Sequence, residues 1–156
     1  MEALLAALEG SALAEALRFS RWGYAAVNAA HILGIALLVG AILPLNLRLL
    51  GLWRSVAQGD LVRVLAPSAA VGLLLAAAAG VLLFSVKAGD YAALAVFQLK
   101  LGLIALGTFA ALLAHWRHGL LLEGATRTRL AGHAAISIFC WLGALTCGRL
   151  IAFVGG

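Results

Sequence analysis

Charged residues are scarce in this chain of 156 residues. They make up 11% of the composition, whereas hydrophobic residues make up 65%. A soluble domain of this size needs a polar surface, and about a quarter of its residues are normally charged. The shortage of charge therefore excludes an ordinary soluble fold. It also changes the meaning of the net charge of +5, because basic residues in a membrane protein first indicate topology. We expect no nucleic-acid partner.

Cysteine and methionine are also scarce. Cys140 and Cys147 stand seven residues apart on one helical face, so they cannot form a disulfide with each other. The chain has no CxxC or CxxCH motif, which excludes covalent attachment of a c-type haem. Its one methionine is Met1, so the soft ligands that suit a Cu(I) path are missing. Nothing resembles a hydrolase triad, a phosphate loop or a paired-carboxylate site.

Long apolar runs dominate the rest of the sequence. A helix needs about 20 apolar residues to cross the hydrocarbon core, and backbone groups in lipid must pair within their own segment. We therefore predict an all-α fold, an integral membrane four-helix bundle within residues 21–156. The second helix is expected to start after Ala66 and Pro67, because proline suits a first turn. The four spans are predicted at about 24–49, 67–86, 91–115 and 130–154.

Residues 1–20 differ from these runs. Leucines alternate there with Glu2, Glu9 and Glu15. A secretory signal peptide would begin with basic residues and end at a small-residue cleavage site, whereas this segment begins acidic. We expect an amphipathic helix that lies in the membrane interface.

The loops predict the orientation. Short connections make successive helices antiparallel neighbours, so both termini fall on one side. The opposite side carries most of the arginines: Arg48, Arg54, Arg63, Arg117, Arg127 and Arg129. The positive-inside rule makes that side cytoplasmic. We expect a multi-pass protein of the bacterial inner membrane with both termini external, in the periplasm. Small residues on the helix faces also suit homo-oligomerisation.

Three basic or imidazole side chains interrupt the apolar runs: His31, Lys100 and Arg149. Each falls about 8–14 Å below the outer interface by its distance along its helix. Asn28, one turn before His31, could orient the imidazole. No Asp or Glu lies in the predicted spans, so an anionic group would relieve the buried positive charge. Haem b meets this need, with His31 as the metal ligand and Lys100 and Arg149 on the propionates.

Other interpretations of these residues remain open. His31 could hydrogen-bond across the bundle, and Lys100 and Arg149 could snorkel to lipid headgroups. His115, His118 and His133 form a second group near the cytoplasmic side, suited to a solvated interfacial role or to a metal or second haem. The chain could instead bind or transport copper or a small solute, or it could be a cofactor-free membrane anchor subunit.

Three stretches resemble an uncharacterised bacterial inner-membrane family: VNAAHILGIALLVGAILPLNLRLLG, FQLKLGLIALGTFAALLAH and SIFCWLGALTCGRLIAF. More distantly, His31 and Lys100 are similar to a pair in the membrane domain of copper-resistance protein D and in the four-helix membrane protoporphyrinogen oxidase. The resemblance implies an inward-facing His31–Lys100 pair and, as in the oxidase-like relatives, a bound b-type haem. Electron transfer between the quinone pool and an external redox protein, or haem-linked redox chemistry, would follow.

Overall fold

The computed structural model describes residues 2–122 and 124–154, in which the regular secondary structure is entirely helical, with no strand. The helices in that part are α1 (Glu2–Glu9), α2 (Ala12–Phe19), α3 (Arg21–Leu49), α4 (Gln58–Ser85), α5 (Ala88–Ala93), α6 (Ala95–His118) and α7 (Arg127–Val154). Within the described residues, α3, α4, α6 and α7 are long and apolar enough to cross a membrane. The prediction of an all-α chain with four helices of membrane-spanning length is confirmed.

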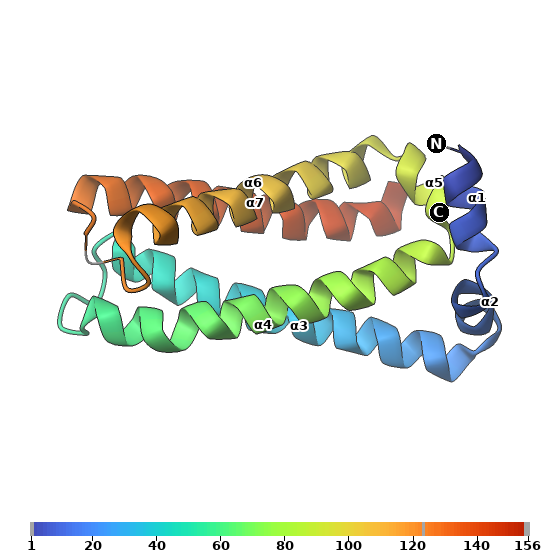
Figure 1. Cartoon of the computed structure of the whole chain (residues 1–156), viewed down its shortest axis with the longest axis horizontal. Coiled ribbons are helices and arrows are strands. Elements are labelled where there is room, and N and C mark those ends of the chain that lie inside the picture. Colours follow the sequence, from blue (N-terminus) through green and yellow to red (C-terminus); the bar gives the residue numbers. More distant parts are fainter. Residues whose placement is uncertain (1, 123, 155–156) are drawn as a thin grey trace.

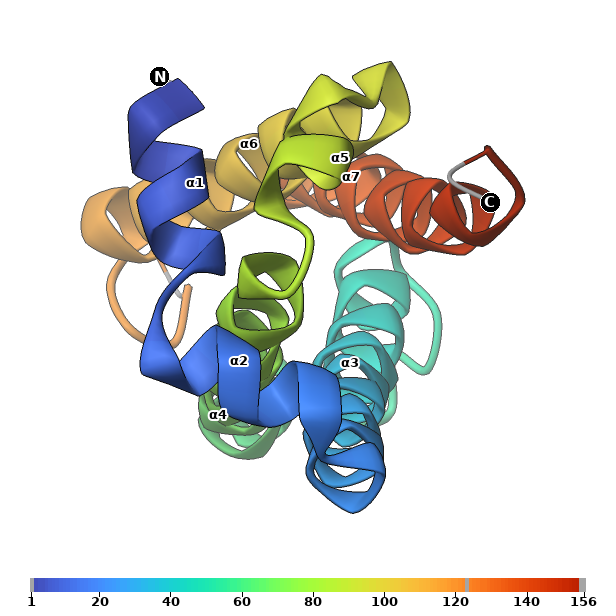
Figure 2. The same cartoon turned by 90° about the vertical axis from the view of Figure 1, so that its right-hand side faces the viewer.

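The long helices form two antiparallel hairpins. α3 packs along α4, α6 packs along α7, and α3 also contacts α7. All four run along the longest axis of the molecule (Figure 1), with α1, α2, α5 and the last turns of α7 at one end. We call this end the terminal end. The opposite end holds the connection 50–57 and residues 119–122 and 124–126 between α6 and α7, and we call it the loop end. Figure 2 looks onto the terminal end and shows α1 and α2 lying across it.

Glycines bring α3 and α4 into backbone contact. A Cβ on Gly34 would lie 2.9 Å from the Cα of Ala76 and from the carbonyl oxygen of Gly72. A Cβ on Gly72 would lie 2.5 Å from the backbone nitrogen of Leu38. No side chain fits at these distances, so glycine is required at both positions. Such small residues are the usual means by which helices approach closely in lipid.

Large apolar side chains join the two hairpins at the loop end. Leu45 and Leu49 of α3 pack there in one cluster with Val62 of α4, Ala114 of α6 and Leu130 of α7. A second cluster lies near the middle of the helices, where Leu38, Ala41 and Ala69 surround Trp141. The hairpins are therefore held together from the loop end to about the middle of their length.

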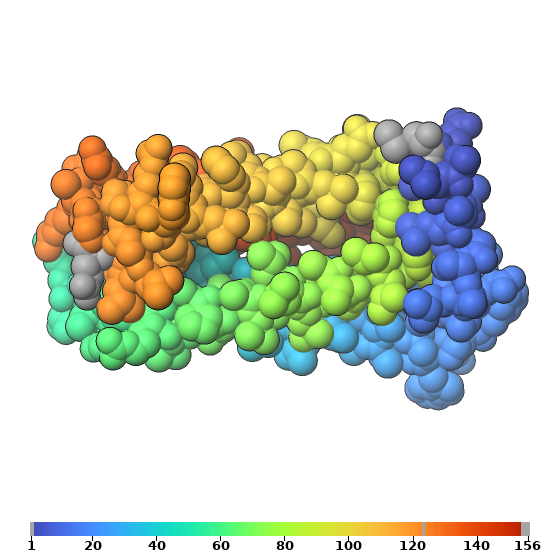
Figure 3. Space-filling model, viewed as in Figure 1, coloured from blue at the N-terminus to red at the C-terminus, as the bar shows by residue number. Residues whose placement is uncertain are grey.

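The half next to the terminal end is more open. The backbones of α4 and α6 do not approach each other closely anywhere in the described chain. Figure 3 shows the surface hollowed between these two helices, from the middle of the molecule toward the terminal end. We call this hollow the inter-hairpin crevice. It opens sideways, toward the surroundings of the long helices.

One predicted helix start is wrong. α4 begins at Gln58, so Pro67 lies inside the helix rather than in its first turn. The proline removes one hydrogen bond within the helix, to the carbonyl of Arg63. The turns before it still form because Val62 is buried in the loop-end cluster and Leu61 packs against it. Packing here outweighs the preference of proline for a helix start.

Two further elements are divided where the sequence predicted one helix. Residues 91–115 fall on α5 and α6, which are separated at Leu94, where the backbone is extended. The side-chain amide of Gln98 donates to the carbonyl of Ala92 at 3.0 Å, so it caps the end of α5. The N-terminal segment forms α1 and α2, and Ser11 caps α2 by accepting from the backbone N–H of Ala14 at 3.3 Å. Met1 lies outside the described residues.

Candidate functional site

His31 bonds to a backbone carbonyl of the neighbouring helix. Its Nδ1 lies 2.7 Å from the carbonyl oxygen of Ala76 in α4. A carbonyl oxygen only accepts, so Nδ1 carries the proton and donates it. In the neutral ring, Nε2 is then left with a lone pair that can bind a metal or accept a hydrogen bond. The half-buried imidazole thus has one nitrogen fixed and one nitrogen available.

Gly80 makes room for this imidazole. It follows Ala76 by one turn of α4, and a Cβ there would lie 3.0 Å from Cε1 and 3.4 Å from Nδ1 of His31. Any larger residue would press on the ring and disturb its hydrogen bond. The sequence signals each residue separately, His31 as a histidine in an apolar run and Gly80 as the end of an alanine run at residues 76–79. Their pairing depends on the packing of α3 along α4, which is a long-range feature of the fold.

Lys100 reaches the same region from the other hairpin. Its aliphatic chain crosses α7 at Gly148, where a Cβ would lie 3.6 Å from Nζ and 3.7 Å from Cε. The side chain is half-buried. His31 and Lys100 thus lie on different hairpins, His31 bonded to α4 and Lys100 packed on α7.

The other two predicted site residues lie on exposed surfaces. The guanidinium of Arg149 sits 4.9 Å from the ring centroid of Phe153 in a cation–π contact, and Arg149 is exposed. Asn28 is also exposed. The orienting partner of His31 is the Ala76 carbonyl rather than the amide of Asn28 one turn earlier. Of the predicted site residues, His31 and Lys100 are half-buried, whereas Asn28 and Arg149 are exposed.

A buried hydrogen-bond donor lies deeper between the hairpins. The indole N–H of Trp141 has no hydrogen-bond partner among the described residues, although Trp141 is only 5% exposed. Its ring packs against Gly107 of α6 and within the middle cluster. Buried polar groups in native proteins almost always have a partner. Here the N–H is enclosed within the middle cluster and is an exception to that rule.

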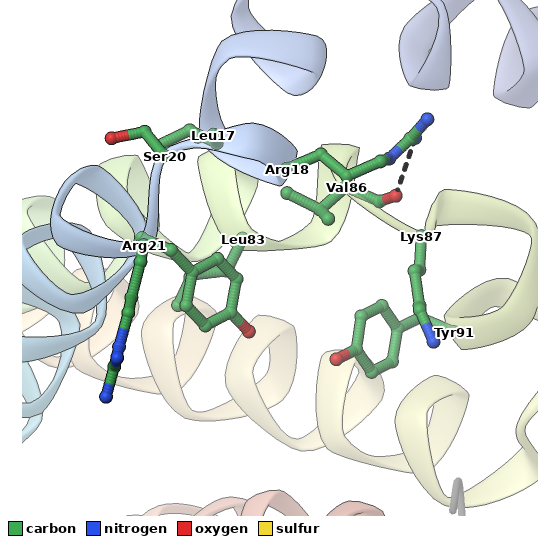
Figure 4. Close-up of a pocket in the computed structure, with 9 residues that line it drawn as sticks. Leu17, Arg18, Ser20, Arg21, Leu83, Val86, Lys87 and Tyr91 are labelled. Carbon is green, nitrogen blue, oxygen red and sulfur yellow. Dashed lines mark hydrogen bonds between the residues drawn. The ribbon is translucent and has the colours of Figure 1, made fainter.

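A basic pocket of about 400 Å³ opens at the terminal end, beside the start of α3. We call it the outer pocket. Arg18, Arg21 and Lys87 supply positive charge, and the rings of Tyr24 and Tyr91 supply apolar wall with a hydroxyl on each. Figure 4 shows the hydroxyl of Tyr91 directed into the pocket and Arg18 bonded to Val86. The Nη2 of Arg18 donates to the Val86 carbonyl at 3.0 Å, which ties α2 to the end of α4.

The outer pocket stands over the His31 position. Tyr24 precedes His31 by two turns of α3, about 10 Å along the same face. Burial raises the pKa of the Tyr91 hydroxyl, and the nearby Tyr24 and Asp90 raise it further. Tyr91 also belongs to an aromatic cluster, in which the rings of Phe84 and Phe97 stack with centroids 5.2 Å apart. This cluster holds α5 between the end of α4 and the start of α6, a role that the sequence analysis missed.

The remaining histidines lie toward the loop end. The rings of His118 and His133 meet edge-on with centroids 6.0 Å apart, whereas the Nδ1 of His115 lies 3.1 Å from the carbonyl oxygen of Leu120. Among the described residues, no group of three or more His, Cys, Asp or Glu side chains could hold a metal ion. Any metal centre formed by this part of the chain would rest on one or two protein ligands.

Comparison with known proteins gives no relative. No protein-family model, no curated protein and no solved structure matches the chain. The likeness to the bacterial inner-membrane family, to copper-resistance protein D and to the protoporphyrinogen oxidase stays a prediction. What the chain does must be argued from its own residues.

Proposed function

We propose that the chain is a multi-pass protein of the bacterial inner membrane. Its long helices expose large apolar side chains around their outer faces, as Leu74, Phe109 and Phe139 illustrate. In the most apolar window of each helix, no more than 22% of residues are buried inside the molecule. Water would leave this surface uncovered, whereas lipid covers it. The arginines at the loop end favour that end as cytoplasmic, with both termini in the periplasm.

We further propose that the protein binds haem b in the inter-hairpin crevice, with His31 as the axial ligand. The observation that carries this proposal is the hydrogen bond from Nδ1 to the Ala76 carbonyl. Metal-ligating histidines commonly donate their second nitrogen to a carbonyl, which fixes the ring and leaves the other nitrogen for the metal. A flat, largely apolar macrocycle also suits a crevice that opens sideways between two apolar helices (Figure 3).

Lys100 is suited to a propionate. A half-buried ammonium needs an anionic partner, and Lys100 lies on the opposite hairpin from His31, where its chain packs over Gly148 of α7. The second propionate could meet Arg18 or Lys87 of the outer pocket, which lies nearer the terminal end. Arg149 is set aside in this proposal because its guanidinium contacts Phe153 on an exposed face.

Haem bound there would supply one-electron exchange, with a quinone or an external redox protein as partner. The chain's own part is to hold the imidazole rigid through Ala76 and Gly80 and to keep the ring in an apolar setting. Axial ligation and burial are two of the means by which a protein sets the potential of a haem. In this proposal, His31, Ala76 and Gly80 would contribute to both the axial ligation and the burial of the haem.

The test is an absorbance spectrum of the detergent-purified protein from haem-replete cells, oxidised and then reduced with dithionite. We expect a Soret band that sharpens and shifts on reduction, and near-complete loss of it in His31→Ala. The matched control is His133→Ala, which removes a half-buried imidazole at the other end of the molecule and should keep the full haem content.

Two results would overturn the assignment. If His31→Ala kept the haem content of the wild type, the iron would have another ligand. If the wild type were colourless, copper analysis of the chelator-treated protein would decide between the remaining functions. About one copper per chain would indicate copper binding or transport, and no metal together with a co-purifying soluble enzyme would indicate a cofactor-free anchor.

A further inference from the structure

A second basic pocket, of about 420 Å³, lies at the loop end, far from His31. We call it the inner pocket. It is formed by the end of α3, the connection 50–57, the start of α4 and the first turn of α7. Arg48, Arg54 and Arg127 line it together with Gln58 and Thr128, and no lining residue carries a carboxylate. Three guanidinium groups thus share one cavity without a negative partner in its wall.

Two of these guanidinium groups are held in place by backbone carbonyls. The Nε of Arg48 donates to the carbonyl of Val56 at 2.8 Å, and the Nε of Arg54 donates to the carbonyl of Gly51 at 3.1 Å. Each bond uses one donor of a group that has five. The paired Nη groups, which form the fork that fits two oxygens of a phosphate or carboxylate, are not used by these bonds.

The backbone of the connection supports this arrangement. Gly51 has φ +108 and Trp53 has φ 49, so both lie in the left-handed region. Glycine adopts it freely, but for tryptophan it costs about 1–2 kcal/mol. A Cβ on Gly51 would lie 3.4 Å from a terminal nitrogen of Arg54, so the turn folds the Arg54 guanidinium back over the chain. Strain of this kind persists where the surroundings require it, and it is common at binding sites.

The same connection exposes apolar side chains beside the pocket. Leu52, Trp53 and Val56 are 46%, 52% and 42% exposed. Tryptophan is typical of the membrane–water interface, so these side chains are suited to enter lipid at the depth where headgroups lie. A cavity of fixed arginines next to an apolar, membrane-inserted loop matches the two parts of a phospholipid.

From this geometry we infer that the inner pocket binds the phosphate of an anionic phospholipid headgroup. Phosphate is the chemistry that the guanidinium forks recognise, and the apolar loop favours lipid over a soluble phosphate as its source. Basic pockets between membrane helices on the cytoplasmic side are known sites for anionic headgroups. The inference does not depend on the haem proposal, because the inner pocket and His31 lie at different levels of the molecule.

The experiment is native mass spectrometry of the purified full chain with phosphatidylglycerol or phosphatidylcholine of identical acyl chains. We expect about tenfold or greater preference for phosphatidylglycerol, because its phosphate charge is uncompensated whereas the choline of phosphatidylcholine neutralises the same phosphate. The double variant Arg48→Gln/Arg54→Gln should reduce binding of phosphatidylglycerol to the level of phosphatidylcholine. Arg127→Gln should also weaken it severalfold, and this variant breaks none of the bonds that hold the connection.

The matched control is Arg63→Gln/Arg129→Gln. It removes the same charge from exposed residues at the same end, outside the pocket lining, and should leave the preference intact. Equal loss in the control and the pocket variant would overturn the inference, because diffuse positive charge would then explain the binding. Equal retention of the two lipids by the wild type would overturn it too. Displacement of phosphatidylglycerol by inorganic phosphate alone would refute a lipid source and identify a soluble phosphate as the ligand.

Discussion

Replacing Gly34 with alanine adds one methyl group where α3 and α4 have no room for it. The new Cβ would lie 2.9 Å from the Cα of Ala76 and 2.9 Å from the carbonyl oxygen of Gly72. Ordinary contacts of a Cβ begin at 3.4 Å, and backbone atoms of a helix cannot rotate away as a side chain would. The two helices must therefore separate by roughly 0.5 Å or more.

Several free-energy terms set the size of the effect. Overpacking of a filled interface costs about 1–3 kcal/mol, and alanine recovers about 0.5–1 kcal/mol by its better helix propensity. The separation also weakens the hydrogen bond of His31, because its acceptor belongs to Ala76, the residue that Gly34 touches. That loss adds about 1 kcal/mol. We expect a net destabilisation of roughly 1–3 kcal/mol, with a looser imidazole.

Reversible unfolding in mixed detergent micelles measures this change, and Gly40→Ala is the control. Gly40 lies in the same helix, but a Cβ there meets nothing within 4 Å, so alanine should be neutral or stabilising by up to about 1 kcal/mol. The haem spectrum supplies a second measurement, in which Gly34→Ala should broaden the Soret band and Gly40→Ala should not. Equal unfolding free energies for the two variants would refute the argument that glycine is needed for the α3–α4 contact.

Two further predictions concern polar groups elsewhere in the fold. Ser137→Ala removes the acceptor, 2.8 Å away, of the buried Asn46 amide that links α3 to α7, and should cost about 1 kcal/mol in the same unfolding assay. Ser68→Ala, an exposed hydroxyl bonded within its own helix, should cost almost nothing, and an equal loss in both would contradict a link between hairpins. For Tyr91, folding raises the hydroxyl pKa above its ordinary value of 10.0. The stability it contributes is present below about pH 10 and is lost as pH rises through the folded-state pKa, so Tyr91→Phe should flatten the alkaline decline in unfolding free energy. An unchanged alkaline decline would contradict this origin.

Hydropathy predicted the long helices because each of them is apolar over most of its length, which the sequence shows directly. It did not predict where α4 begins. The turns from Gln58 to Ala66 include Asp60 and Arg63, so their mean hydropathy is low. They are helical because Val62 and Leu61 pack into the loop-end cluster, a long-range contact that a local pattern does not contain. The division at Leu94 likewise depends on the aromatic cluster of three helices.

The candidate site was likewise predictable from the sequence only in part. His31 and Lys100 stand out in the sequence because an ionisable side chain in an apolar run is costly and therefore conspicuous. The partner of His31 is a backbone oxygen, which every residue has, so no residue type could have indicated Ala76. Arg149 is as conspicuous as Lys100 in the sequence. In the structure it lies on an exposed face of α7, where its guanidinium contacts Phe153. Composition therefore identifies candidate site residues, whereas the helical face on which each residue lies decides whether it points between the helices.

The location of the crevice follows from the sizes of side chains along the hairpins. Toward the loop end, Leu45, Leu49 and Leu130 fill the space between α3 and α7. Level with His31, residues 76–80 of α4 read AAAAG, and side chains this small cannot reach the other hairpin. The small side chains therefore leave the crevice open to whatever surrounds the long helices. A lipid acyl chain would need only apolar walls. The imidazole of His31, fixed by Ala76, and the half-buried ammonium of Lys100 are more than an acyl chain requires, and they are the reason for proposing a ligand that has a metal and carboxylates.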